Sequence, residues 1–125
     1  MDAGLDWDSC RRFADGYFLT ARKMQWFRNH YLRSSADAED PRVSPVRAKT
    51  FDGLVPAMVI TAGYDPLLDA GKAYADRLRA AGVPVQYHCF EAWPHGYFYW
   101  GASEAAQDTM RMCIDAVRAS WNLPT

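Results

Sequence analysis

A run of ten mostly apolar residues, VPAMVITAGY at positions 55–64, constrains the fold more than any other part of the chain. Continuous runs of this length that are rich in β-branched residues are typical of a strand buried on both faces, and such strands favour a parallel sheet covered by helices. A helical pattern follows at residues 69–81, and a second strand pattern follows at residues 85–91. Strand, helix and strand with short connections predict a right-handed βαβ unit and therefore an α/β fold.

The rest of the chain is predicted to form two helices and two loops. Residues 1–18 are polar and contain two glycines, so we expect a loop there. Residues 19–32 predict a helix with Thr20 as its N-cap and with Met24, Phe27 and Tyr31 on one stripe. Residues 33–50, with two prolines, predict an ordered loop. Ser103 is expected to cap a last helix. The apolar face of that helix consists of Ala106, Met110, Cys113, Val117 and Trp121.

Length, composition and charge exclude several classes of protein. A chain of 125 residues, half of them hydrophobic, predicts one domain with a packed core. The net charge is −1, with 14 basic and 15 acidic residues interspersed, which argues against a nucleic-acid partner. The longest apolar run, residues 54–62, is too short to span a bilayer, and the N-terminus does not resemble a signal peptide. We therefore expect a cytoplasmic protein with no membrane partner.

The cysteines argue against a metal site. Cys10, Cys89 and Cys113 form no CxxC motif and no Cys/His pair at metal-ligand spacing. We expect three free thiols in a reducing compartment, with Cys89 and Cys113 buried, and neither a metal nor a cofactor.

Two residues with side chains suited to acid–base catalysis follow the two predicted strands. Asp65 comes directly after the first strand, and His95 lies just beyond the second, on a loop expected at residues 92–101. Parallel strands end on one rim of a sheet, where ligands bind in open α/β sheets. An Asp that binds a His ring nitrogen fixes its tautomer and stabilises the imidazolium, as in a catalytic triad. We expect the pair within hydrogen-bond distance, although each residue alone also fits a simpler interpretation, as a helix-entry or loop residue.

Several motifs together resemble one enzyme family. These motifs run from ADGYFLT through WFRNHYL and DPRVSP to LVPAMVITAGYDPLLDAGKAYADRLRAAGVPVQYHCFEAWPHGYFYW. Over this stretch the chain resembles the C-terminal part of a hormone-sensitive-lipase-like carboxylesterase, a family IV esterase of the α/β-hydrolase fold. The most specific motifs are DPLLDAG and HGY at this spacing, preceded by DPRVSP. Family members usually read His-Gly-Phe where this chain has HGYF.

The resemblance implies roles for individual residues. Asp65 would be the triad acid and His95 the triad base of a carboxylic ester hydrolase acting on small to medium esters. Residues 1–50 would be a cap-region loop and helix, and residues 51–125 would be the C-terminal βαβα part of the hydrolase core. The candidate walls of the substrate pocket are Trp26, Phe27, Trp93, Tyr97 and Phe98.

The nucleophile implied by the resemblance is missing. The family places its serine in a Gly-Asp-Ser-Ala-Gly elbow and its oxyanion hole in an upstream His-Gly-Gly-Gly loop, and neither occurs here. None of the six serines has a strand, a turn and a helix with flanking glycines around it. We therefore expect about the last two fifths of such an enzyme, with Met1 either an internal methionine that serves as a start or the end of an upstream deletion.

Three interpretations remain open. In the first, the chain is catalytic only with an upstream partner chain that brings the serine and the oxyanion hole. In the second, it is a truncated, non-catalytic α/β module that self-associates as a homo-oligomer, because two strands alone leave edges and faces uncovered. In the third and weakest, it is a remnant of a peptidase-type α/β hydrolase, against which DPRVSP and DPLLDAG argue.

Overall fold

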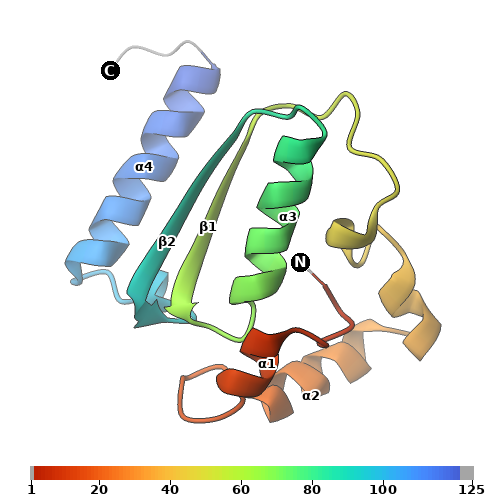
Figure 1. Cartoon of the computed structure of the whole chain (residues 1–125). Helices are drawn as coiled ribbons and strands as arrows, with labels where there is room; N and C mark the ends of the chain where they lie inside the picture. Colours follow the sequence, from red (N-terminus) through yellow and green to blue (C-terminus); the bar gives the residue numbers. More distant parts are fainter. Residues whose placement is uncertain (1, 122–125) are drawn as a thin grey trace. The chain divides into compact units, whose positions relative to one another are not determined.

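The computed structural model describes residues 2–121 (Figure 1). Its strands are β1 (Ala57–Tyr64) and β2 (Val85–Pro94). Its helices are α1 (Asp8–Arg12), α2 (Ala21–Tyr31), α3 (Leu68–Ala80) and α4 (Glu104–Ser120), with short 3₁₀ turns η1 (Ser35–Glu39), η2 (Pro45–Arg47) and η3 (Tyr97–Tyr99). The chain divides into two compact units, Met1–His95 and Gly96–Thr125. The division at residue 50 into a cap region and a hydrolase core stays a prediction.

The predicted βαβ unit is confirmed. Strands β1 and β2 pair in parallel, with Ala57 opposite Val85 at the start of the ladder. Helix α3 connects them and packs against β1, beside which it runs in Figure 1. Strand β1 begins two residues later than the apolar run suggested, and β2 ends at Pro94, three residues later than predicted. The first part of the expected loop at residues 92–101 is therefore strand.

An irregularity in the ladder explains the longer second strand. Ala62 pairs with Phe90, but Tyr64 pairs with Pro94, so β2 uses four steps where β1 uses two. Gly63 lies at this point, where a Cβ atom would stand 2.0 Å from the carbonyl oxygen of Glu91. Only glycine fits this close backbone approach. The bulge lets both strands end together at the rim that Asp65 and His95 follow.

Helix α3 ends in the manner that its sequence predicts. Gly82 adopts a left-handed conformation with φ of 79°. Its N–H donates to the carbonyl of Arg79 at 2.9 Å, and the N–H of Val83 donates to that of Leu78 at 3.0 Å. These are the two hydrogen bonds of a Schellman motif. Leu78 and Val83 are buried together with Phe51, so the motif also anchors an apolar cluster of the first unit.

The N-terminal part corrects one prediction and confirms another. Residues 1–18 are not loop throughout, because α1 forms at Asp8–Arg12 and is held by contacts with the start of α3. Thr20 caps α2 as predicted, since its hydroxyl accepts the N–H of Lys23 at 3.2 Å. Leu19 and Met24, on either side of this cap, are buried in one cluster with Cys10.

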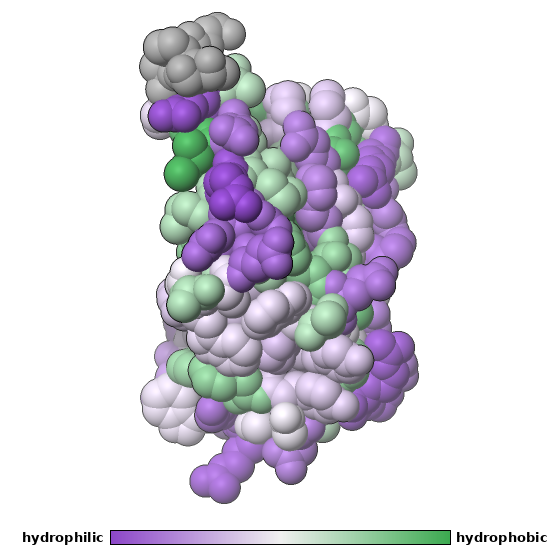
Figure 2. Space-filling model, turned by 90° about the vertical axis from the view of Figure 1, so that its left-hand side faces the viewer, coloured by the Kyte–Doolittle hydropathy of each residue, from purple (hydrophilic) through white to green (hydrophobic). Residues whose placement is uncertain are grey.

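The second unit contains η3 and α4. Ser103 caps α4 as predicted, because its hydroxyl accepts the N–H of Ala106 at 3.2 Å. Tyr97 is buried, and its hydroxyl lies 2.7 Å from that of Thr109. The expected apolar face of α4 is only partly covered. Three of its members, Met110, Val117 and Trp121, are exposed, as is the neighbouring Ile114. Figure 2, which faces this side of the molecule, shows apolar patches among polar residues.

Neither a spanning helix nor a metal cluster occurs in the described part of the chain. Within residues 2–121 no helix has the length and apolar character needed to cross a bilayer. The same residues contain no group of three or more His, Cys, Asp or Glu side chains that could hold a metal ion. All three cysteines are free, but the buried one is Cys10. Cys89 and Cys113 are partly exposed, contrary to expectation, because the elements that carry them are only partly covered.

Candidate active site

Asp65 and His95 meet beyond the carboxyl ends of the two strands. The Nδ1 atom of His95 lies 2.8 Å from Oδ2 of Asp65, which confirms the contact expected from the sequence. The Asp65 side chain is 11% exposed, whereas that of His95 is 35% exposed. Among the described residues nothing hydrogen-bonds to Nε2 of His95. The pair therefore combines a buried carboxylate with an imidazole that has one nitrogen available.

The carboxylate of Asp65 divides its two oxygens between two partners. While Oδ2 faces His95, Oδ1 accepts the backbone N–H of Leu67 at 2.8 Å. The backbone carbonyl of Asp65 accepts the N–H of Leu68 at 3.0 Å. An Asp side chain that binds the N–H two residues later fixes its own turn. The turn between β1 and α3 thus orients the carboxylate toward His95.

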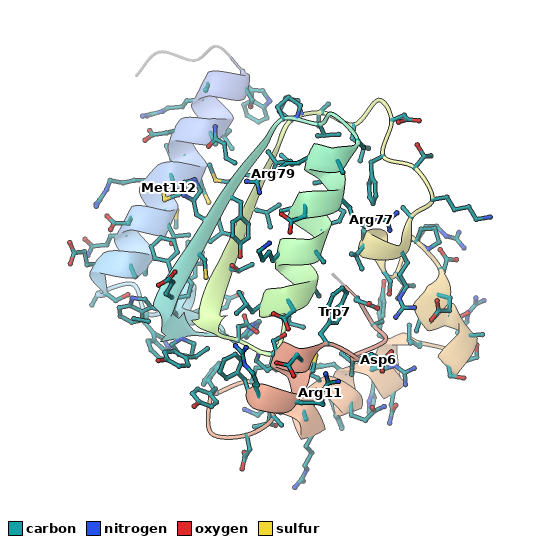
Figure 3. The ribbon with its side chains drawn as sticks, in the orientation of Figure 1. Asp6, Trp7, Arg11, Arg77, Arg79 and Met112 are labelled. Carbon is teal, nitrogen blue, oxygen red and sulfur yellow. The ribbon has the colours of Figure 1, made fainter. Side chains whose placement is uncertain are left out.

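Helix α1 holds the same turn from outside. The hydroxyl of Ser9, which is fully buried, donates to the carbonyl oxygen of Pro66 at 2.7 Å, and the Cys10 thiol donates to the same oxygen at 3.2 Å. The Ser9 N–H donates to Oδ2 of Asp69 at 2.8 Å, and the Asp69 N–H donates to the Ser9 hydroxyl at 3.2 Å. Burial raises the pKa of the Cys10 thiol, so the thiol keeps its proton as a donor. Figure 3 labels Trp7, the N-cap residue of α1, and Arg11, which lies on α1 after Ser9 and Cys10.

An apolar cavity of about 330 Å³ lies beside His95 within the first unit. Its lining consists of Asp2, Ala3, Leu5, Leu19, Met24, Phe27, Arg28, Tyr31, Val43, Leu67 and His95. Met24, Phe27 and Tyr31 come from the single stripe of α2 that the helical spacing predicts. A pocket with apolar walls and a few polar groups at one end is typical of a small-molecule site.

Several hydrogen bonds tie the N-terminal wall of this cavity in place. The N–H of Ala3 donates to the Ser44 hydroxyl, and Nε of Arg28 donates to the Ala3 carbonyl, both at 2.8 Å. The carboxylate of Asp2 accepts from Nε of Arg47 and from the indole N–H of Trp7, each at 2.9 Å. The segment that closes the cavity is therefore bound to α2 and to the loop at residues 40–47.

Burial and hydrogen bonding act in opposite directions on Asp2. Burial by itself raises the pKa of this carboxyl, because it disfavours the charged form. The hydrogen bonds from Arg47, from the Gly4 amide and from the Trp7 indole outweigh burial, so the pKa lies below the ordinary value of 3.8. Asp2 is thus held ionised where it borders the cavity.

The candidate pocket residues are found in different places. Phe27 lines the cavity, but Trp26 lies outside the lining, is 55% exposed and stacks on His30 with ring centroids 4.1 Å apart. Trp93 is half-buried on β2, outside the cavity lining. Tyr97 and Phe98 belong to the second unit, where Tyr97 is buried and Phe98 is 37% exposed. The predicted role of these five side chains in substrate binding stays a prediction.

Sequence reasoning missed two sets of residues. It placed Ser9 and Cys10 in a loop, and no local pattern indicates that they reach the turn after Asp65, 56 or 57 residues away. It also missed Leu5 and Val43 as cavity walls, because both lie in irregular segments without periodicity. The helical stripe of α2, by contrast, was a usable signal for Met24.

A parallel βαβ unit with a carboxylate–imidazole pair at its carboxyl rim defines the class, an α/β protein of the hydrolase type. A family model described as the alpha/beta hydrolase fold matches residues 3–99, and the chain therefore belongs to this family. The predicted resemblance to ester hydrolases of this fold is thereby confirmed.

Individual relatives are ester hydrolases by name. The carboxylic ester hydrolase LipN of Mycobacterium tuberculosis is 44% identical over 98 residues, which are 75% of this chain and 26% of that protein. Ethyl acetate hydrolase of Pseudomonas putida is 35% identical over 118 residues, or 94% and 37% of the two chains. A solved esterase of the fungus Rhizomucor miehei superimposes with a TM-score of 0.86 at 31% identity, covering 94% of this chain and 37% of that one. The chain thus spans between 26% and 37% of the length of these relatives.

Proposed function

We propose that this chain supplies the acid–base pair of a carboxylic ester hydrolase, with His95 as general base and Asp65 as the carboxylate that orients it. The observation that supports this most directly is the 2.8 Å contact between Nδ1 of His95 and Oδ2 of Asp65. Because an ionised carboxylate can only accept, the proton of the neutral imidazole is assigned to Nδ1. Nε2 then has a free lone pair, which is the arrangement that a general base requires.

The proposed chemistry follows from this assignment. Nε2 takes the proton of a serine hydroxyl as the serine attacks the ester carbonyl, and Asp65 stabilises the imidazolium that forms. The same imidazolium then gives its proton to the leaving alcohol. The serine and the oxyanion donors come from sequence outside this chain, in an upstream segment or an upstream partner chain. Oxyanion donors usually contribute the largest part of such catalysis, so the chain alone is expected to be inactive.

We propose small to medium carboxylic esters as substrates. The apolar cavity of about 330 Å³ beside His95 has room for the acyl or alcohol part of such an ester. Phe27 and Tyr31 form its α2 side, and Leu67 lies next to the turn of Asp65. The name of the Pseudomonas putida relative, ethyl acetate hydrolase, agrees with a substrate at the small end of this range.

A chimeric enzyme tests the proposal. The C-terminal part of the Pseudomonas putida relative is replaced by this chain, and hydrolysis of a short-chain aryl ester is measured. His95→Asn and Asp65→Asn should each lower kcat by about 10³- to 10⁴-fold. His30→Asn is the matched control, because His30 lies on the exposed face of α2 and binds the backbone carbonyl of Trp26; its activity should equal that of the parent.

The outcomes distinguish a chain that supplies the catalytic acid–base pair from a non-catalytic α/β module. A chimera that melts cooperatively but has no activity, or one whose activity survives His95→Asn, contradicts the proposed function. Circular dichroism and thermal melting of every variant exclude loss of folding as the cause.

A second proposal, self-association, rests on the uncovered apolar surface. The sheet of the described residues has two strands, and residues 57–60 of β1 are only partly buried. Val117 on α4 is 46% exposed, and Trp121, the C-cap residue of α4, is 70% exposed. Surfaces of this kind usually mark an interface. We propose that a second copy, most simply in a two-fold dimer, or the upstream segment covers them; the cytoplasmic location stays a prediction.

A further inference from the structure

One peptide group connects helix α1 to the carboxylate of Asp65. The carbonyl of Pro66 and the N–H of Leu67 belong to the same planar unit and point in opposite directions. On one side, the carbonyl accepts from Ser9 and Cys10. On the other side, the Leu67 N–H donates to Oδ1 of Asp65 at 2.8 Å.

The position of this plane depends on a single rotation. The ring of Pro66 fixes its φ angle, so relative to Pro66 the plane can turn only about ψ of Pro66, with a matching change in φ of Leu67. A hydrogen bond to the carbonyl at 2.7 Å restrains that rotation, and with it the direction of the Leu67 N–H. If the plane turned, Oδ1 would lose its donor, the carboxylate would rotate, and Oδ2 would leave Nδ1 of His95.

Ser9 is itself rigidly held. Its side chain is fully buried, and its hydroxyl both donates to Pro66 and accepts the N–H of Asp69. Its own N–H is bound by the Asp69 carboxylate at 2.8 Å. A buried hydroxyl with all its partners in place cannot move without leaving polar groups unpaired. Ser9 is thus held in place and restrains the turn between β1 and α3 through its hydrogen bond to Pro66.

We propose that Ser9 is a positioning residue for Asp65, and that it acts through the Pro66–Leu67 peptide group. Its relevance to catalysis rests on the proposed function of Asp65 and His95, but the mechanical coupling does not. Cys10 is the weaker second donor to the same carbonyl. Ser9, which lacks the surroundings of a nucleophilic serine, would therefore align the carboxylate of Asp65 instead.

The test measures the tautomer of the His95 imidazole. In the complete chain at about pH 9, where imidazole is neutral, ¹⁵N NMR of the His95 ring reports the ratio of the Nδ1–H to the Nε2–H tautomer. The parent should be almost wholly Nδ1–H, since that proton is bound by Asp65. Ser9→Ala should lower the ratio about three- to tenfold, the change expected for one hydrogen bond of ordinary net strength.

Ser103→Ala is the matched control. It makes the same substitution at a serine whose hydroxyl also accepts a backbone N–H, at the start of α4. This variant should leave the tautomer ratio unchanged. If Ser9→Ala does not fold, Cys10→Ala removes the other donor and should shift the ratio in the same direction by a smaller factor.

The results decide between positioning and general stability. An unchanged ratio in Ser9→Ala, or in Cys10→Ala where the first variant does not fold, overturns the proposal, as does an equal shift in Ser103→Ala. In the chimeric enzyme, Ser9→Ala should lower kcat about three- to tenfold without changing KM. If the chimera is inactive, the proposed function fails while the tautomer measurement still tests the coupling.

Discussion

Gly63→Ala is the substitution that most severely tests the link between the sheet and the candidate site. The added Cβ would lie 2.0 Å from the carbonyl oxygen of Glu91 and 2.6 Å from its carbonyl carbon and Cα. All three are backbone atoms, so no side chain can rotate away. Real Cβ atoms essentially never approach closer than 3.0 Å, and the two strands must therefore part by about 1 Å at the bulge.

The size of the effect follows from this displacement. A backbone hydrogen bond of about 2.9 Å that lengthens by 1 Å is lost. Overpacking of this kind costs about 1–3 kcal/mol, and one or two broken hydrogen bonds add about 1 kcal/mol each. We expect the free energy of unfolding to fall by about 3 kcal/mol, which is a large part of the roughly 5–15 kcal/mol that is typical of small domains.

Urea unfolding followed by circular dichroism at a fixed protein concentration measures this loss. With a slope of about 1–3 kcal/mol per molar urea, the midpoint should fall by about 1–3 M. Gly101→Ala is the control, because a Cβ there meets nothing within 4 Å. Its stability should stay within about 0.5 kcal/mol of the parent. If the two variants unfold at the same urea concentration, and His95 keeps its Nδ1–H tautomer in both, the bulge is not needed to position Asp65 and His95.

The isolated chain should hydrolyse a short-chain aryl ester no faster than buffer, since it has no elbow serine; activity that disappears with one of six single Ser→Ala changes would instead identify an unexpected nucleophile. Light scattering should show a dimer or larger assembly that Val117→Glu weakens, whereas a stable monomer of 14.2 kDa that binds no apolar dye would contradict self-association. Because the pKa of Asp2 is lowered in the folded chain, its stabilising effect is complete above about pH 4 and is lost as the pH falls through the lowered value. Asp2→Asn should thus lower the free energy of unfolding by about 2 kcal/mol at pH 7, and this loss should shrink as the pH falls through the lowered pKa, as measured by urea midpoints; a loss that is independent of pH would refute the assignment.

The βαβ unit could be predicted because all its signals are local. The β-branched run before Asp65 indicates a buried strand, and Gly82 sets the end of the helix through a conformation that other residues avoid. Once two parallel strands are given, the rule that they end on one rim brings Asp65 and His95 together. The contact at hydrogen-bond distance, 2.8 Å in the structure, could therefore be predicted from the sequence.

The parts that escaped prediction depend on distant partners. A five-residue helix such as α1 is too short to be stable alone, and it forms because Ser9 and Cys10 bind the turn at Pro66. The bulge at Gly63 depends on the backbone of Glu91, which no local pattern reports. Trp26 and Phe27 are equally aromatic neighbours, but successive side chains on a helix point about 100° apart, so only one of them faces the cavity.

The sequence separation of the acid–base pair has a kinetic consequence. Only 30 positions, most of them one helix and its two short connections, separate Asp65 from His95. Closing so short a loop costs little chain entropy, and contacts of low sequence separation form fast. A ribosome synthesises the chain from its N-terminus, so a serine upstream would be made, and its domain partly folded, before the base that activates it. If the proposed function holds, a hydrolase with this order of parts cannot cleave esters before β2 has been synthesised and has paired with β1.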